Sequence, residues 1–159
     1  MSVRVIVYSD GACSGNQNTE NYGGWGAVII GVGAFDGKEI IRKEIYGSAK
    51  NTTNNIMELT GAIKALQSIK RKDFPVEVYV DSNYVLQGIT QWINGWKSRG
   101  WRKADKKPVE NKELWIKLDE ERNKFSNISF VKVKGHSGVE LNELADQLAN
   151  KGISEAKGA

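Results

Sequence analysis

Two acidic residues stand where β-strand patterns stop. Asp10 follows the β-branched run at 3–7, and Asp81 follows the alternating run at 76–80. The carboxyl ends of parallel strands meet at one edge of an α/β sheet, where ligands bind. An acid that ends a buried strand costs stability unless it is ligated or hydrogen-bonded. We therefore expect Asp10 and Asp81 to share a site at this edge.

Two further acids can reach the same edge. Glu58 lies in the first turn of an expected helix, and Asp146 lies on the last expected helix. Four clustered carboxylates repel one another unless a cation neutralises them. Mg²⁺ suits such a set because it uses few carboxylates, keeps water and takes phosphate oxygens. Two such ions ~4 Å apart can stabilise the attacking and leaving oxygens of an in-line phosphoryl displacement.

Taken singly, these acids also fit ordinary structural roles. Asp81 could cap the helix that follows it. Glu58 could be the reciprocal acid of a capping box opened by Asn55. Asp146 could be a solvated acid on a helix face. The expected joint geometry of the acids, rather than any one of them, therefore carries the hypothesis of a metal site.

Histidine and cysteine each occur once. His136 lies in a glycine-flanked loop, where it fits either a plain exposed side chain or a proton carrier near neutral pH. Because Cys13 is the single cysteine, the chain can form neither an internal disulfide nor a cysteine-rich zinc site. We interpret Cys13 as an unreactive thiol.

Positive charge is concentrated in one segment. Residues 97–107 contain six basic residues and one acid, whereas the rest of the chain has 17 basic and 18 acidic residues, within a total net charge of +4. Such a localised basic segment indicates an anionic partner. Trp92, Trp96 and Trp101 would ordinarily be assigned to the core, but their interleaving with basic residues points to nucleic acid.

Alternating and helical periodicities predict the elements that must position these residues. Strand patterns cover 3–10, 25–30, 39–46, 76–80 and 128–133, and helical patterns begin near 55, 82, 111 and 139, the last two running to about 124 and 151. Helices separate the first, fourth and fifth strands, which favours parallel pairing. The second and third strands form an antiparallel flank. We predict an α/β fold: a five-stranded mixed sheet with helices on both faces.

Length and composition favour a single soluble domain. The chain has 159 residues, 40% of them hydrophobic and 26% charged, without repeats or a low-complexity segment. No apolar run approaches the roughly 20 residues of a membrane span, and no signal-peptide pattern opens the chain. We expect one domain over 1–159, cytoplasmic, monomeric and without a membrane partner.

Five motifs in order resemble type 1 ribonuclease H, closest to its short bacterial form, over nearly the whole chain. They are Ser9–Asn16, Thr52–Leu59, Asp81–Val85, the long stretch from Gln87 to Val109, and Val133–Gly138 with Asn142–Asp146 after it. The resemblance implies a ribonuclease H-like fold and hydrolysis of the RNA strand of an RNA–DNA hybrid.

The resemblance also assigns catalytic roles. Two Mg²⁺ ions, for which Mn²⁺ could substitute, would be held by carboxylates that match Asp10, Glu58, Asp81 and Asp146. His136 matches a loop histidine that assists proton transfer or product release.

Positions that contact the hybrid follow from the same resemblance. Asn16, Asn54 and Asn55 match residues near the scissile strand, and Thr53 and Asn111 match a pocket for a DNA phosphate. A basic protrusion at about 92–107 would meet the DNA strand through Trp92, Trp96, Lys97, Arg99 and Trp101.

The chain departs from the family in three places. The loop 17–22 lacks the usual proline and glycine, Asn51 replaces a common basic residue, and Ile56 replaces a common arginine. These changes concern the grip on phosphate rather than the chemistry. Because the first strand starts at once, we expect no amino-terminal hybrid-binding domain and distributive action.

Three rival hypotheses remain open at this point. The chain could be a different metal-dependent nuclease of the same fold, a non-catalytic nucleic-acid-binding module, or a domain of a reverse transcriptase. The basic segment and the asparagine-rich motifs argue against the first, and the presence of all four acids argues against the second.

Overall fold

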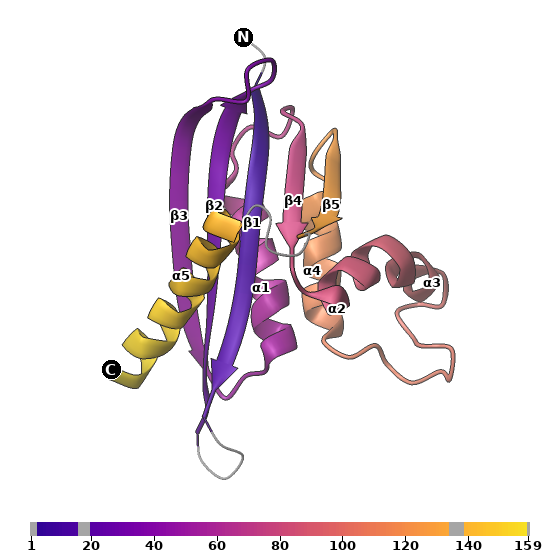
Figure 1. Cartoon of the computed structure of the whole chain (residues 1–159). Coiled ribbons are helices and arrows are strands. Elements are labelled where there is room, and N and C mark those ends of the chain that lie inside the picture. The colour runs from indigo at the N-terminus through magenta and orange to yellow at the C-terminus, as the bar shows by residue number, and fades with distance from the viewer. Residues whose placement is uncertain (1–2, 16–19, 134–138, 159) are drawn as a thin grey trace.

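The computed structural model describes residues 3–15, 20–133 and 139–158, which form a five-stranded sheet flanked by helices (Figure 1). The strands are β1 (Val3–Ser14), β2 (Tyr22–Gly33), β3 (Glu39–Lys50), β4 (Val76–Val80) and β5 (Ile128–Lys132). The helices are α1 (Asn54–Ser68), α2 (Asn83–Gln87), the π-helical turn η1 (Gly88–Trp92), α3 (Ile93–Ser98), α4 (Lys112–Arg122) and α5 (Val139–Gly158).

The sheet has the order β3-β2-β1-β4-β5. β1 pairs in parallel with β4, and β4 pairs in parallel with β5, whereas β1, β2 and β3 form antiparallel neighbours. The predicted α/β fold class, with three parallel strands and an antiparallel flank, is confirmed.

Helices cover both faces of the sheet, so two hydrophobic clusters form. The larger cluster lies between the sheet and the helices α1 to α4, and it includes the fully buried side chains of Leu59, Leu66 and Trp115. The smaller one lies where α5 crosses β2, around Val28 and Leu148 (Figure 1). The sheet is thereby fixed from both sides, which provides a rigid base for its polar edge.

β1 does not stop at Asp10, although the glycine that follows Asp10 suggested that it would. The parallel pairing with β4 ends at Ser9 opposite Val80, but β1 continues to Ser14 because β2 pairs with it throughout, placing Asp10 opposite Gly26. Asp10 and Asp81 therefore each come one residue after the last parallel pair. The predicted end of the strand was wrong, but the predicted shared edge for these two residues is correct.

Helix α1 begins two residues earlier than the proposed capping box requires. Thr53 is the N-cap, and its side-chain oxygen accepts a hydrogen bond of 3.1 Å from the backbone N–H of Ile56. The assignment of Asn55 and Glu58 as a capping box was therefore wrong, and the Glu58 carboxylate is free of that role.

The segment after β4 is capped by Ser82, whose hydroxyl accepts a hydrogen bond of 3.2 Å from the Val85 N–H. Asp81 is thus not the cap. The single helix expected from Ser82 is interrupted by the π-helical turn at Gly88, where a Cβ atom would lie 2.0 Å from the Trp115 ring. This close packing joins η1 to α4.

The remaining differences concern the lengths of elements. β2 and β3 both run further than predicted because they pair along their whole lengths. α5 extends to Gly158 rather than 151. Within the described ranges, no helix combines the length and apolarity that crossing a bilayer requires.

Candidate active site

Gly11 brings β1 into direct contact with the first turn of α1. A Cβ atom at Gly11 would lie 2.4 Å from the backbone nitrogen of Glu58, so only glycine permits this approach. A Cβ atom at Gly61, one turn further along α1, would lie 3.0 Å from the Asp10 carbonyl oxygen. The backbone contact therefore sets the Glu58 side chain beside Asp10.

The carboxyl groups of Asp10 and Glu58 are hydrogen-bonded to one another. Burial raises the pKa of Asp10 to about 6, although the hydrogen bonds from Glu58 and from the Gly11 N–H, the latter 2.9 Å long, oppose the rise. Burial, followed by the charge of Asp10, raises the pKa of Glu58 to about 9. At neutral pH the pair therefore retains a proton that two isolated carboxylates would lose.

Helix α5 places Asp146 against the same pair. A Cβ atom at Gly26, the partner of Asp10 in β2, would lie 2.5 Å from the Ala145 carbonyl oxygen, so the helix packs directly on the strand backbone. The carboxyl group of Asp146 is hydrogen-bonded to that of Asp10. Asn150 donates a hydrogen bond of 3.5 Å to Asp146 from the next turn.

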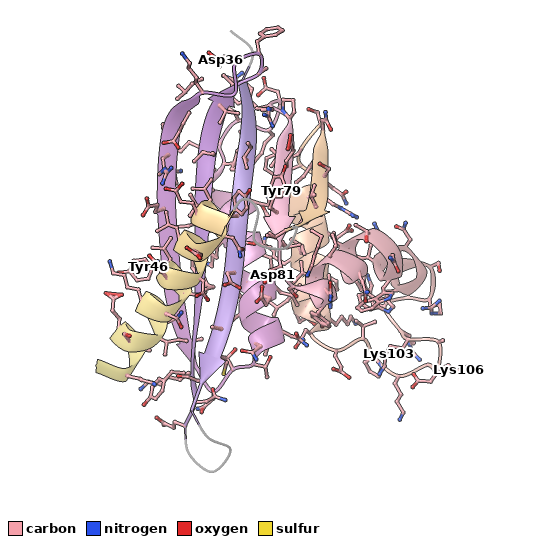
Figure 2. All side chains as sticks on the ribbon, viewed as in Figure 1. Asp36, Tyr46, Tyr79, Asp81, Lys103 and Lys106 are labelled. Carbon is pink, nitrogen blue, oxygen red and sulfur yellow. The ribbon has the colours of Figure 1, made fainter. Side chains whose placement is uncertain are left out.

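Asp81 is exposed, with 62% of its side chain accessible. Figure 2 labels it close to the end of β4. Its negative charge contributes to the raised pKa of Glu58, which places it within electrostatic range of the pair. The Lys132 ammonium donates to the Asp81 backbone carbonyl and lies 3.4 Å from its Oδ1 atom.

The acids meet in pairs rather than as one compact cluster. In the part of the chain that the structure describes, no group of three or more histidine, cysteine, aspartate or glutamate side chains could hold a metal ion as arranged. Their chemistry nevertheless fits a hard divalent cation, because every donor is a carboxylate oxygen and burial, followed by the neighbouring carboxylates, raises the pKa values of Asp10 and Glu58. Small side-chain rotations toward a cation would relieve the repulsion between these carboxylates.

The residues expected near the RNA strand are only partly described. Asn16 and His136 lie outside the described residues. Asn54 and Asn55 are exposed on the first turn of α1, next to the Thr53 cap. Both residues lie within about one helical turn of Glu58 in the chain.

Asn111 precedes α4 in a left-handed backbone conformation, with φ of 56°. Its side-chain amide donates a hydrogen bond of 3.1 Å to the Tyr84 hydroxyl, which also accepts one of 3.0 Å from the Trp115 indole. Asn111 is thus held in place by the core. Tyr84, which the helical pattern marks only as an apolar residue, acts as the polar anchor of this region.

Some residues of the basic segment that we expect to bind substrate make contacts within the protein. The Lys97 ammonium lies 2.9 Å from a carboxylate oxygen of the buried Asp119, and the Arg99 side chain donates a hydrogen bond of 3.1 Å to the Arg102 carbonyl. Trp96 is only 9% exposed and packs against Trp92 and Trp115. Trp96 thus offers little ring surface for stacking on a nucleotide.

Other residues of the segment face outward. Trp92 is 37% exposed, and both Lys106 and Lys107 are exposed on the loop that extends from the body of the protein, where Figure 2 labels Lys103 and Lys106. Lys103 lies 3.9 Å from Glu110, a long and weak ion pair. Lys106 and Lys107 therefore add accessible positive charge beyond Lys97 and Arg99, which are exposed too but make contacts within the protein.

Comparisons with known protein sequences point to one family. The RNase H family model matches residues 2–154. A ribonuclease H of Chromobacterium violaceum is 50% identical over 94% of this chain and 95% of its own length. A ribonuclease H of Francisella tularensis subsp. novicida is 51% identical over 98% of this chain and 94% of its own.

A solved structure resembles the fold closely. The crystal structure of LC9-RNase H1, described as a type 1 RNase H with the type 2 active-site motif, has a TM-score of 0.83 and 33% identity, covering 98% of this chain and 74% of the other. Sequence and fold therefore agree, and the chain belongs to the ribonuclease H family.

Proposed function

We propose that this chain is an endoribonuclease that hydrolyses the RNA strand of RNA–DNA hybrids with divalent metal ions. Its membership of the ribonuclease H family supports the reaction, and the relatives that match it over nearly their whole length carry the name ribonuclease H. The observation that carries the proposal is the contact of Asp10 with Glu58 and Asp146 at the carboxyl edge of the parallel strands.

The four acids have distinct tasks in this proposal. Asp10 lies between Glu58 and Asp146 and provides the shared ligand, while Asp81 completes the set from the end of β4. When bound, two Mg²⁺ ions, or Mn²⁺ in their place, would activate water and neutralise the charge on the phosphate oxygens. The proton held by Asp10 and Glu58 must leave as the cations bind, because only carboxylates are good ligands for them.

We assign proton transfer or product release to His136. A histidine of ordinary pKa can exchange protons near pH 7. Its place in the chain, between β5 and α5, leads to the helix that carries Asp146.

Recognition of the hybrid is divided between two surfaces in this proposal. Asn16, Asn54 and Asn55 would meet 2′-hydroxyls of the RNA strand, which DNA lacks. Thr53 and Asn111 would hold a DNA phosphate. Of these residues, Thr53, Asn54 and Asn55 lie at the start of α1, and Asn111 lies directly before α4.

The basic protrusion at 92–107 would contact the DNA strand. Trp92 and Trp101 retain accessible surface, and Lys106 and Lys107 provide positive charge toward solvent. Lys97 and Arg99 would act mainly by fixing the shape of the protrusion. We further propose that residues 1–159 work as one catalytic domain, as a monomer in the cytoplasm.

The test is incubation with three labelled duplexes of the same sequence: an RNA–DNA hybrid, duplex RNA and duplex DNA, each with Mg²⁺ or with a chelator. Only the RNA of the hybrid should be cut, and only with Mg²⁺, while an Asp10→Asn variant should bind without cutting. Cleavage of duplex DNA would indicate another metal-dependent nuclease. Binding without cleavage by the unaltered chain would indicate a non-catalytic module.

A further inference from the structure

Lys132 lies where the edge strand passes the end of β4. It is the last residue of β5, the outermost strand on this side of the sheet, and it stands opposite Val80 in the parallel register. The backbone N–H of Val133 donates a hydrogen bond of 3.0 Å to the Val80 carbonyl. This register sets the base of the Lys132 side chain beside Asp81.

The Lys132 ammonium contacts Asp81 in two ways. It donates to the backbone carbonyl of Asp81, and it lies 3.4 Å from the Oδ1 atom of the same residue. Lys132 makes one ion pair within the described residues 3–15, 20–133 and 139–158, and its partner is Asp81. A positive charge is therefore committed to a carboxylate to which the proposed mechanism assigns a divalent cation.

We propose that Lys132 is a positioning residue that holds Asp81 before the divalent cation binds and then competes with that cation for the carboxylate. This inference rests on the proposed role of Asp81 as a metal ligand. Lys132 thereby sets how much divalent cation the site needs for occupancy.

The strength of the contact suits such a competitor. The two side chains are 38% and 62% exposed, and ion pairs between exposed groups are weak. The lysine ammonium is a point charge on a flexible stem, so it can withdraw from Asp81 without disturbing the strand. A divalent cation at the site binds the carboxylate more strongly because of its higher charge, but it must first displace the lysine.

A purely structural role makes a different prediction. The bond from Lys132 to the Asp81 carbonyl ties β5 to the start of α2, and this tie does not depend on charge at the carboxylate. Lys132→Gln keeps a hydrogen-bond donor without the charge, Lys132→Met removes both, and Lys132→Arg keeps both. The three variants therefore separate competition by charge from simple tethering.

The decisive measurement is calorimetric titration of the nucleic-acid-free protein with Mg²⁺, repeated with Mn²⁺. We expect Lys132→Met and Lys132→Gln to bind the ion roughly threefold to tenfold more tightly than the unaltered chain, as expected for loss of one nearby charge in a solvated site. Lys132→Arg should bind like the unaltered chain. Lys43→Met is the matched control, because Lys43 donates to a helix carbonyl, that of Ser68, away from the acids.

Two further readouts complete the test. In an Asp81→Asn background, Lys132→Met should no longer change the metal affinity. The Mg²⁺ concentration for half-maximal cleavage of the hybrid should fall by a similar factor in Lys132→Met, with little change in the rate at saturation. Circular dichroism of each variant confirms that it folds.

Unchanged or weaker metal binding in both neutral variants, or tighter binding in Lys132→Arg as well, would overturn the proposal. If the unaltered chain binds Mg²⁺ but cuts no hybrid, the proposed function fails while the titrations still decide the role of Lys132. If the unaltered chain binds no divalent cation in the titration, both fail together.

Discussion

The carboxyl groups of Asp10 and Glu58 are hydrogen-bonded across the junction of β1 and α1, at the point where Gly11 lets the two backbones touch. The contact places two half-buried acids where one proton must remain between them at neutral pH. The protein without metal is therefore under electrostatic strain at this position. Several consequences of this strain can be measured.

Neutralising either acid should abolish activity and stabilise the metal-free protein. We expect Asp10→Asn and Glu58→Gln each to lower turnover on the order of 10³-fold or more, because metal ligands supply several kcal/mol of transition-state stabilisation. The melting temperature in chelator should rise, since the repulsion is removed. Glu113→Gln, an exposed acid on α4, is the control and should change neither quantity. Near-native turnover of either variant at saturating Mg²⁺ would remove that residue from the catalytic set.

The same pair should make the metal-free protein less stable as the pH rises. Folding raises the pKa of Asp10 from 3.8 to about 6 and that of Glu58 from 4.5 to about 9. Between these values the folded state binds more protons than the unfolded state, so stability falls from about pH 4 to about pH 9. This loss is measured as the melting temperature against pH in chelator, relative to Glu58→Gln. A difference between the two proteins that does not vary with pH contradicts the raised pKa values.

Alternation and glycine placement allowed the sheet and the shared edge of Asp10 and Asp81 to be predicted. The local signal at Gly11 was misinterpreted, because a glycine that ends a strand and a glycine that admits a neighbouring backbone look alike in sequence. Gly24 and Gly26 have the same role as Gly11. Each faces a backbone carbonyl of α5, so the absence of a side chain lets the helix that bears Asp146 pack against the strand. Such contacts join segments far apart in the chain, and a single sequence does not state which partner a glycine meets.

The limits of sequence reasoning are clearest in the basic segment and at Lys132. The buried Asp119, which pairs with the charge of Lys97, lies on α4, and charge counting within residues 97–107 does not reveal it. Lys132 reaches Asp81 only because β5 is the neighbour of β4 in the sheet. The sequence shows which segment carries a charge, but the partners of that charge in the folded protein decide whether it is available to a substrate.

Lysines of the basic segment should therefore separate into two groups. Lys97→Met should lower the free energy of unfolding by roughly 1 kcal/mol, because it leaves the buried Asp119 with Arg122 as its remaining partner. Lys106→Gln combined with Lys107→Gln should leave stability unchanged. Chemical denaturation of the two variants measures this contrast, and equal stability losses would contradict it.

Binding of the hybrid should depend on Lys106 and Lys107, although the stability of the protein does not. For each phosphate that the Lys106 and Lys107 double variant can no longer neutralise, the slope of log affinity against log salt should fall by about one. Lys64→Gln, an exposed lysine on α1, serves as the control and should not alter the slope. If the double variant keeps the salt dependence of the unaltered chain, the outer part of the protrusion is only a solvated surface.

Loss of the histidine should slow the enzyme without stopping it. In the proposed function the divalent cations would supply an activated water, so His136→Ala would remove only a proton carrier. We expect turnover to fall by roughly 10²-fold or less, with the pH dependence of turnover altered. Single-turnover and steady-state rates of the variant distinguish slow chemistry from slow product release. A loss as complete as that of Asp10→Asn would show that its role is larger than proton transfer.

The last prediction is selectivity for the RNA strand and for several ribonucleotides in a row. Asn54 and Asn55 are exposed side by side at the start of α1, and with Asn16 they provide contacts for more than one 2′-hydroxyl. A DNA strand carrying four consecutive ribonucleotides, paired with DNA, should be cut, whereas the same strand with one ribonucleotide should be cut hardly at all. Asn54→Ala and Asn55→Ala should raise KM for the four-ribonucleotide substrate, with Asn123→Ala, an exposed asparagine at the end of α4, as the control. Efficient cleavage at a lone ribonucleotide would mean that a single sugar suffices for recognition, and the assignment of these asparagines to consecutive 2′-hydroxyls would have to be abandoned.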